Sequence, residues 1–107
     1  MAFSTEFVAK ADEYQTIIQT MRTQSSTVFI PEGEWMCSLT ATLSIPTTRS
    51  SWIELDGKRA TIDKVDESSY SNADVGVVVP SFIGGRSISI KADLSRTMTL
   101  YAAKIGY

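Results

Sequence analysis

Histidine is absent from this chain of 107 residues, and cysteine occurs once, at Cys37. Without histidine the chain lacks the usual general base, the usual zinc ligand and the base of Ser–His or Cys–His nucleophile pairs. It also lacks a glycine motif that cradles phosphate, because Gly84-Gly85 lies between predicted strands and not before a helix. We therefore expect no catalytic residue, no cofactor and no metal, so the chain is predicted not to be an enzyme.

Long apolar runs and an excess of basic residues are missing as well. No run approaches the ~20 residues of a membrane helix, so we expect no membrane span. The net charge of −2 and the pI near 5.0 give no electrostatic footprint for nucleic acid or anionic lipid. The start, MAFSTEFVAKADEY, has no basic leader before an apolar core, so no signal peptide is expected. An unpaired cysteine suits assembly in a reducing cytoplasm, with Cys37 as a small buried hydrophobe.

Carboxylates gather in one polar segment, Asp63 to Asp74, which we expect to be an exposed loop. Oxygen ligands of this kind could bind calcium, but the spacing of the four acids matches no calcium-loop pattern. A paired-carboxylate glycosidase site would need a cleft, for which a loop is poor support. We therefore assign no metal or catalytic site to the acids of this segment: Asp63, Asp66, Glu67 and Asp74.

The segment from Trp35 to Ile45 organises what is present, because every second residue in WMCSLTATLSI is apolar. Successive side chains of a strand point to opposite faces, so this pattern predicts a long strand with one buried and one hydroxylated face. A turn at Pro31 to Glu34 leads into it from a short strand at Thr27 to Ile30. Pro46 ends it, because proline cannot donate to a central ladder.

A hairpin is predicted around Asp56-Gly57, the strongest short turn signal in the chain. A two-residue turn pairs Leu55 with Lys58 and Glu54 with Arg59. This register places the apolar residues on one face and a Glu54–Arg59 ion pair on the other. The residues expected to face inward are Ile53, Leu55, Ala60 and Ile62.

Three strands follow, at Val75 to Val79 (ended by Pro80), at Ser87 to Leu94 and, after Ser95-Arg96, at Thr97 to Ile105. In Ser87 to Leu94 the residues expected inward are Ile88, Ile90, Ala92 and Leu94. The last strand is apolar on both faces, which is typical of a strand covered on both sides. One face meets the core, and the other needs the N-terminal segment or a neighbouring subunit.

Thr5 to Arg22 carries apolar residues with spacing 4, 3, 4, 3, which predicts an amphipathic helix. This helix could pack on its own sheet or form a short coiled-coil stalk. With the polar connector Thr23 to Ser26 it gives an N-terminal part, residues 1–26, for docking or assembly, before a β-domain at 27–107. The predicted subunit interface joins the helix to the last strand: Phe7, Tyr14, Ile18, Met21, Tyr101, Ala103, Ile105 and Tyr107.

Six to eight strands predict a single all-β, antiparallel sandwich or jelly roll. From Thr27 onward, FIPEGEWMCSLTATLSI, SSWIELDGKRATI, VVVPSFIGGRSISIKADL and TMTLYAAKIGY resemble the compact trimeric jelly-roll heads of tailed-bacteriophage structural proteins and of complement and tumour-necrosis-factor type domains. The chain lacks a long fibrous stem and the complement-type aromatic pattern, which favours a small virion protein. The resemblance implies a homotrimer located in the virion.

Two functions remain open. The first is a non-enzymatic structural protein, a capsid decoration or cement protein or a head-fibre component, that binds capsid or fibre proteins. The second is a tail or fibre tip that binds a host-surface receptor or glycan through exposed aromatic residues. The candidate receptor contacts are Trp52, Tyr70 and Phe82, with Arg49 and Asp63 as polar neighbours.

Overall fold

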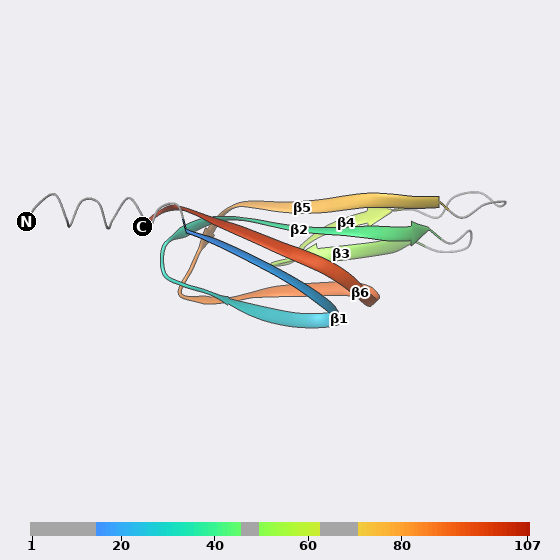
Figure 1. Cartoon of the computed structure of the whole chain (residues 1–107), viewed down its shortest axis with the longest axis horizontal. Helices are drawn as coiled ribbons and strands as arrows, with labels where there is room; N and C mark the ends of the chain where they lie inside the picture. Colours follow the sequence, from blue (N-terminus) through green and yellow to red (C-terminus); the bar gives the residue numbers. More distant parts are fainter. Residues whose placement is uncertain (1–14, 46–49, 63–70) are drawn as a thin grey trace, which may run out of the picture.

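The computed structural model describes residues 15–45, 50–62 and 71–107, and the part described is an antiparallel all-β structure. Its six strands pair in the order β4-β3-β6-β2-β5, with β1 beside β6 (Figure 1). The all-β, antiparallel expectation is confirmed. The strands are β1 (Thr16–Ile30), β2 (Glu34–Ile45), β3 (Ser51–Leu55), β4 (Lys58–Ile62), β5 (Ser71–Ile83) and β6 (Arg86–Gly106).

Strands β1 and β6 bend together and fold the sheet into two layers. Thr23 lies opposite Arg96 but Ser25 lies opposite Lys91, so β6 carries extra residues at this point. Such a bulge bends a strand, and Figure 1 shows both strands doubling back here. The first half of β6 pairs with β3, and its second half pairs with β2. The two strands expected on either side of Ser95-Arg96 are therefore one strand with a corner at the predicted gap.

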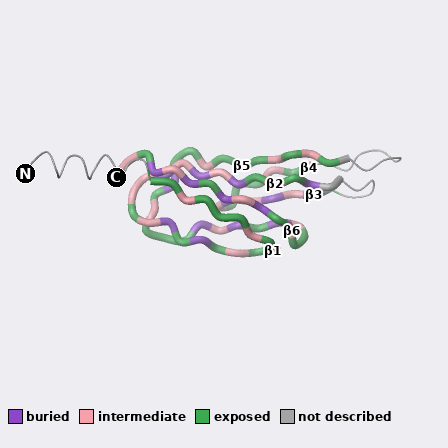
Figure 2. The backbone as a smooth tube through the Cα atoms, in the orientation of Figure 1, coloured by how far each residue is buried: buried purple, intermediate pink, exposed green. Residues whose placement is uncertain are grey.

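The core lies between the two layers. Figure 2 shows buried residues alternating along the central strands, as period-2 patterning requires. Each large apolar side chain in this cluster stabilises the fold by roughly 1.5–3 kcal/mol. Leu94, expected to be inward, is instead exposed because it lies at the bend of β6. The central members of the core are Trp35, Cys37, Leu39, Ile53, Leu55, Ile88, Ile90, Met98, Leu100 and Ala102.

The β3–β4 hairpin confirms the predicted register. Leu55 lies opposite Lys58 and Glu54 opposite Arg59, around a two-residue turn. Asp56 and Gly57 both have positive φ, 50° and 83°, which is the backbone that an Asp-Gly turn adopts readily. Local turn chemistry therefore sets this pairing.

The expected N-terminal helix is wrong over residues 16–22, which form the first half of β1. Ile18 and Met21 were expected on one helical stripe, but in the strand they lie on opposite faces. The physical reason is that isolated helices are marginal, whereas β6 supplies backbone partners along this whole segment. The connector Thr23 to Ser26 also belongs to β1, so the expected boundary after residue 26 falls inside a strand. Gln15 precedes β1 and accepts a hydrogen bond from Lys104 N, whereas residues 5–14 of the expected helix, including Phe7 and Tyr14, lie outside the described residues.

Strand β5 is longer than expected at both ends. It includes Asp74, which was assigned to a loop, and continues through Pro80. Val79 pairs with Cys37 and Phe82 with Trp35, so β5 has one extra residue where Pro80 lies. A proline is tolerated at such a bulge on an edge strand because the ladder there needs no donor. The bulge lets the strand pass the proline and carry Phe82 into the core.

The turn before β2 and the turn before β6 are hydrogen-bonded to each other, at the end of the layers opposite the bend. Gly84 N donates to Gly33 O and Gly85 N to Ile30 O, both at 2.7 Å. The indole Nε1 of Trp35 donates to Pro31 O at 2.9 Å. A Cβ on Gly84 would overlap the Pro31 carbonyl, so this position requires glycine.

Candidate functional site

Each layer turns one face to solvent. We call the outward side of β4, β3, the first half of β6 and the second half of β1 the β3 face. The outward side of β5, β2, the second half of β6 and the first half of β1 is the β2 face. The two faces differ in how their side chains are partnered.

On the β3 face, charged side chains form ion pairs, and one of them covers the ring of Trp52. The Arg59 guanidinium lies 3.6 Å from the ring centroid of Trp52 and 3.1 Å from Glu54 Oε1. Trp52 is half-buried under this cation, which reduces its value as the predicted receptor contact. Arg86 forms a similar pair with Asp56 at 3.4 Å.

Phe82, the other aromatic candidate among the described residues, shares no exposed surface with Trp52. Phe82 is 1% exposed and belongs to the core, so its assignment as a receptor contact is wrong. Arg86 covers its ring, with a distance of 4.1 Å to the centroid. The bulge in β5 turns Phe82 inward, a feature that periodicity alone does not reveal. Tyr70, Arg49 and Asp63 lie outside the described residues.

The β2 face carries an exposed apolar strip. Ile18 and Tyr101 are opposed in the β1–β6 ladder and are 68% and 37% exposed. Ser38 continues this row to β2 and pairs with the exposed Val78 on β5. The strip as defined here consists of Ile18, Met36, Val78, Tyr101, Ala103 and Ile105.

The residues predicted for the subunit interface do not all lie on one face of the sheet. Ile18, Tyr101, Ala103 and Ile105 share the β2 face, as the facing of the last strand predicted. Tyr107, two residues after Ile105, is also exposed. The ammonium group of Lys104 lies 4.4 Å from the centroid of its ring. Met21 faces the core instead, because its ladder partner is the fully buried Met98.

A polar cavity opens on the same layer where β2 and β6 separate. Their pairing ends at Thr40 and Thr99, while β2 continues with β5 and β6 slopes away towards the bend (Figure 1). The cavity has a volume of about 470 Å³. Its walls are guanidinium and hydroxyl groups from three strands: Arg22, Thr42, Ser95, Arg96, Thr97 and Thr99.

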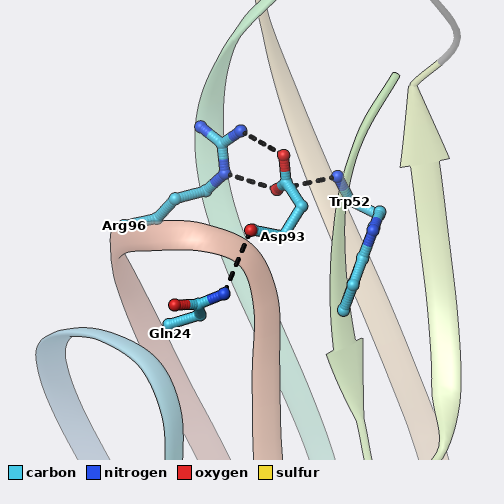
Figure 3. Close-up of polar contacts among 4 residues, drawn as sticks. All are labelled: Gln24, Trp52, Asp93 and Arg96. Atoms are coloured by element: carbon cyan, nitrogen blue, oxygen red, sulfur yellow. Dashed lines mark hydrogen bonds and ion pairs between the residues drawn. The ribbon is translucent and has the colours of Figure 1, made fainter. Parts of the chain in front are cut away.

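Asp93 fixes one cavity wall by holding Arg96. Figure 3 shows the paired contacts, with Arg96 Nε 3.0 Å from Asp93 Oδ1 and Nη2 3.1 Å from Oδ2. The backbone N–H of Trp52 also donates to Asp93 Oδ1, and Gln24 Nε2 donates to the Asp93 carbonyl, both at 3.2 Å. The two ion-paired side chains are only 12% and 8% exposed. They therefore join the bend to β3 as one fixed unit.

These contacts change the acidity of Asp93. Burial on its own would raise the pKa of this carboxyl group. Hydrogen bonds from Arg96 and from Trp52 N–H, together with the charge of Arg96, outweigh that effect and hold the pKa below its ordinary value. Asp93 is therefore a structural anion, and it is already occupied by its partners.

The thiol of Cys37, the single cysteine, is not activated by its surroundings. Burial, followed by the charge of Asp56, raises the pKa of the Cys37 thiol to about 11, so the thiolate is scarce at neutral pH. Residues 15–45, 50–62 and 71–107 contain no group of three or more His, Cys, Asp or Glu side chains that could hold a metal. Over the same residues, no helix has the length and apolarity needed to cross a membrane.

Sequence reasoning missed the cavity, although it identified the hydroxylated face of β2. The usable signal was the alternation of Thr40 and Thr42 on one strand with Thr97 and Thr99 on another. Comparisons with protein families, curated proteins and solved structures find no match for this chain. The site must therefore be interpreted from its own geometry.

Proposed function

We propose that the chain is a non-enzymatic structural protein of a bacteriophage virion, a decoration, cement or head-fibre component that assembles as a homotrimer. The observation that carries the proposal is the apolar strip on the β2 face. Water contact along such a strip is unfavourable, and contiguous apolar patches of several hundred Å² mark association sites. The virion assignment and the count of three subunits rest on the sequence resemblance.

The finer fold proposal is a jelly roll. Its support is the folding of the β1–β6 ladder into two layers with a common core. In the proposed trimer, a closed cyclic arrangement buries the strip once per subunit with one repeated contact. The remaining exposed surfaces are then free to bind capsid or fibre proteins.

Light scattering tests the assembly directly. At micromolar concentration we expect a mass three times the chain mass of 11.7 kDa. Tyr101→Glu places a charge in the strip and should cost each contact about 2 kcal/mol or more, giving monomers. Phe29→Glu is the matched control, since Phe29 is an aromatic residue 62% exposed on the β3 face.

The two variants separate the possible results. Monomers with Tyr101→Glu and trimers with Phe29→Glu support assembly through the β2 face. Dissociation by Phe29→Glu alone would transfer the interface to the β3 face. A monomeric wild-type protein would contradict self-assembly and leave another virion protein as the partner of the strip.

The polar cavity favours a second candidate function, recognition of a host-surface glycan by a tail or fibre tip. Hydroxyl and guanidinium groups suit the oxygen-rich surface of a sugar, and Arg22 and Thr97 lie in the cavity wall. Electron microscopy of labelled particles distinguishes the two functions. Density spread over the capsid supports decoration, whereas density confined to a tail or fibre end supports recognition.

A further inference from the structure

The cavity between β2 and β6 has more free hydrogen-bond donors than acceptors. The Thr42 hydroxyl already donates to Asp74 Oδ1 at 2.6 Å, so inside the cavity it can only accept. Thr20 and Thr99 share one hydrogen bond at 3.0 Å. Arg96 uses Nε and Nη2 on Asp93, which leaves its Nη1 group available.

Arg22 supplies the larger share of the free donors. Across residues 15–45, 50–62 and 71–107, no hydrogen bond or ion pair engages its guanidinium group. It lies on the exposed face of β1 and reaches the same cavity as Arg96. Among the described residues that line the cavity there is no carboxylate, and the nearby carboxylates of Asp93 and Asp74 are hydrogen-bonded to Arg96 and Thr42. The site therefore carries an uncompensated cation in a chain whose net charge is −2.

We propose that this cavity binds an oxyanion, a carboxylate, sulfate or phosphate group carried by a small polar molecule such as an acidic sugar. The Arg22 guanidinium group binds the anion through its planar fork, and Arg96 Nη1 donates from the opposite wall. Thr97 and Ser95 add hydroxyl donors. A volume of about 470 Å³ exceeds what a bare ion needs and falls in the range of small-molecule sites.

The site is organised before a ligand arrives. Arg96 is held at two nitrogens by Asp93, and Asp93 is held by Trp52 and Gln24 (Figure 3). Fixing a guanidinium group in advance reduces the side-chain entropy that binding must overcome. The wall built from Arg96 is therefore rigid, and Arg22 is the adjustable side chain.

The site is separate from the surface proposed for assembly. Arg22 lies four residues along β1 from Ile18, about 13 Å at strand spacing. Thr99 of the cavity wall lies only two residues from Tyr101 on β6, about 7 Å, so the cavity borders the strip and its Arg22 end is the part farthest from it. The inference does not depend on the virion assignment, and it can fail or succeed independently of the trimer.

Amide and guanidinium NMR shifts provide the test. The ¹⁵N-labelled full chain is titrated with sodium glucuronate, sodium sulfate and sodium phosphate, with glucose and sodium chloride as controls. We expect saturable shifts at Arg22, Thr42, Thr97 and Thr99 with at least one oxyanion and none with the controls. Saturation by glucuronate alone identifies a carboxylate ligand, and saturation by sulfate or phosphate identifies a tetrahedral one.

Arg22→Gln and Lys91→Gln each remove one positive charge, and comparing them isolates the role of Arg22. Arg22→Gln should raise the dissociation constant at least tenfold, and Arg22→Lys should raise it less, because the charge remains but the fork is lost. Lys91→Gln removes the same charge from the β3 face and should change nothing. Tyr101→Glu should retain binding even when it dissociates the oligomer.

Three results would overturn the proposal. They are shifts that grow linearly without saturating, equal effects of Arg22→Gln and Lys91→Gln, and shifts centred away from the cavity. The first two would mean that the ions act only through general screening of the surface, and the third that they bind at another place. Unchanged melting temperatures of the variants establish that a loss of binding is not a loss of fold.

Discussion

The two outer faces of the folded sheet arise from the same alternation of inward and outward side chains, but they differ in how their exposed side chains are partnered. On the β3 face, Glu54, Arg59 and Trp52 partner one another across the hairpin. On the β2 face, Ile18 and Tyr101 lie side by side in solvent, and Arg22 has no described partner. The contrast is between polar and aromatic side chains that are partnered within the chain and exposed side chains that have no described partner.

The contacts of the β3 face contribute little to stability. Arg59 is 47% exposed, and exposed ion pairs are typically worth about 0–1 kcal/mol. Their effect is to cover the ring of Trp52 and to pair Glu54 with Arg59 across the hairpin. The β2 face has a different character, because it combines the exposed apolar strip with an arginine and hydroxyl groups that line the cavity. The proposed self-association is therefore assigned to the β2 face.

The largest expected effect comes from the core that both faces share. Leu39→Asp places a carboxylate where the side chain is fully buried, and we expect a loss of about 5 kcal/mol or more, enough to unfold the domain. Thr40→Asp, one residue along on the exposed β2 face, should cost about 1 kcal/mol or less. Circular dichroism melting curves provide the measurement. Similar melting temperatures for both variants would mean that the facing of β2 is wrong.

A smaller effect is expected at the bend that joins the two layers. Asp93→Asn removes the charge that holds Arg96 and should destabilise the fold by about 2 kcal/mol at pH 7. Asp56→Asn, at the more exposed pair with Arg86, is the control and should cost less than about 1 kcal/mol. Urea denaturation at pH 7 gives both values.

The effect of Asp93 should depend on pH with a defined sign. Its folded-state pKa is lowered, so its contribution is fully present above the ordinary carboxyl value of 3.8 and is lost as pH falls through the lower folded-state value. The difference in unfolding free energy between wild type and Asp93→Asn should therefore shrink below about pH 4. A difference that stays constant from pH 7 to pH 3 would contradict a charge-based role.

The smallest effect is expected on the β3 face. Arg59→Ala removes a cation over Trp52 and an exposed ion pair, so we expect a loss of about 1 kcal/mol, or roughly 4–8 °C in melting temperature. Its mass in light scattering should match that of the wild type. A change of oligomeric state in Arg59→Ala would remove the distinction between the two faces.

Local patterns predicted those parts of the fold that local forces determine. The Asp56-Gly57 turn set the register of its hairpin, and the alternation of Trp35 to Ile45 identified the buried face of β2. The facing of Met98 and Tyr101 followed from the same rule. Residues 16–22 were misassigned because Ile18 and Met21 fit a helical spacing equally well, and only pairing with β6 decides between the two states.

The sequence by itself determined the all-β class, the longest strand of the core, the hairpin and the two-faced character of the last strand, because turn geometry and side-chain alternation act between near neighbours. Tertiary structure alone decided the bend that folds β6 and the inward turn of Phe82 at a bulge. It also brought Arg22, Thr42 and Thr97 to one cavity. These features depend on which distant strands pair and where their registers shift, and such non-local contacts leave no periodic signal in the chain.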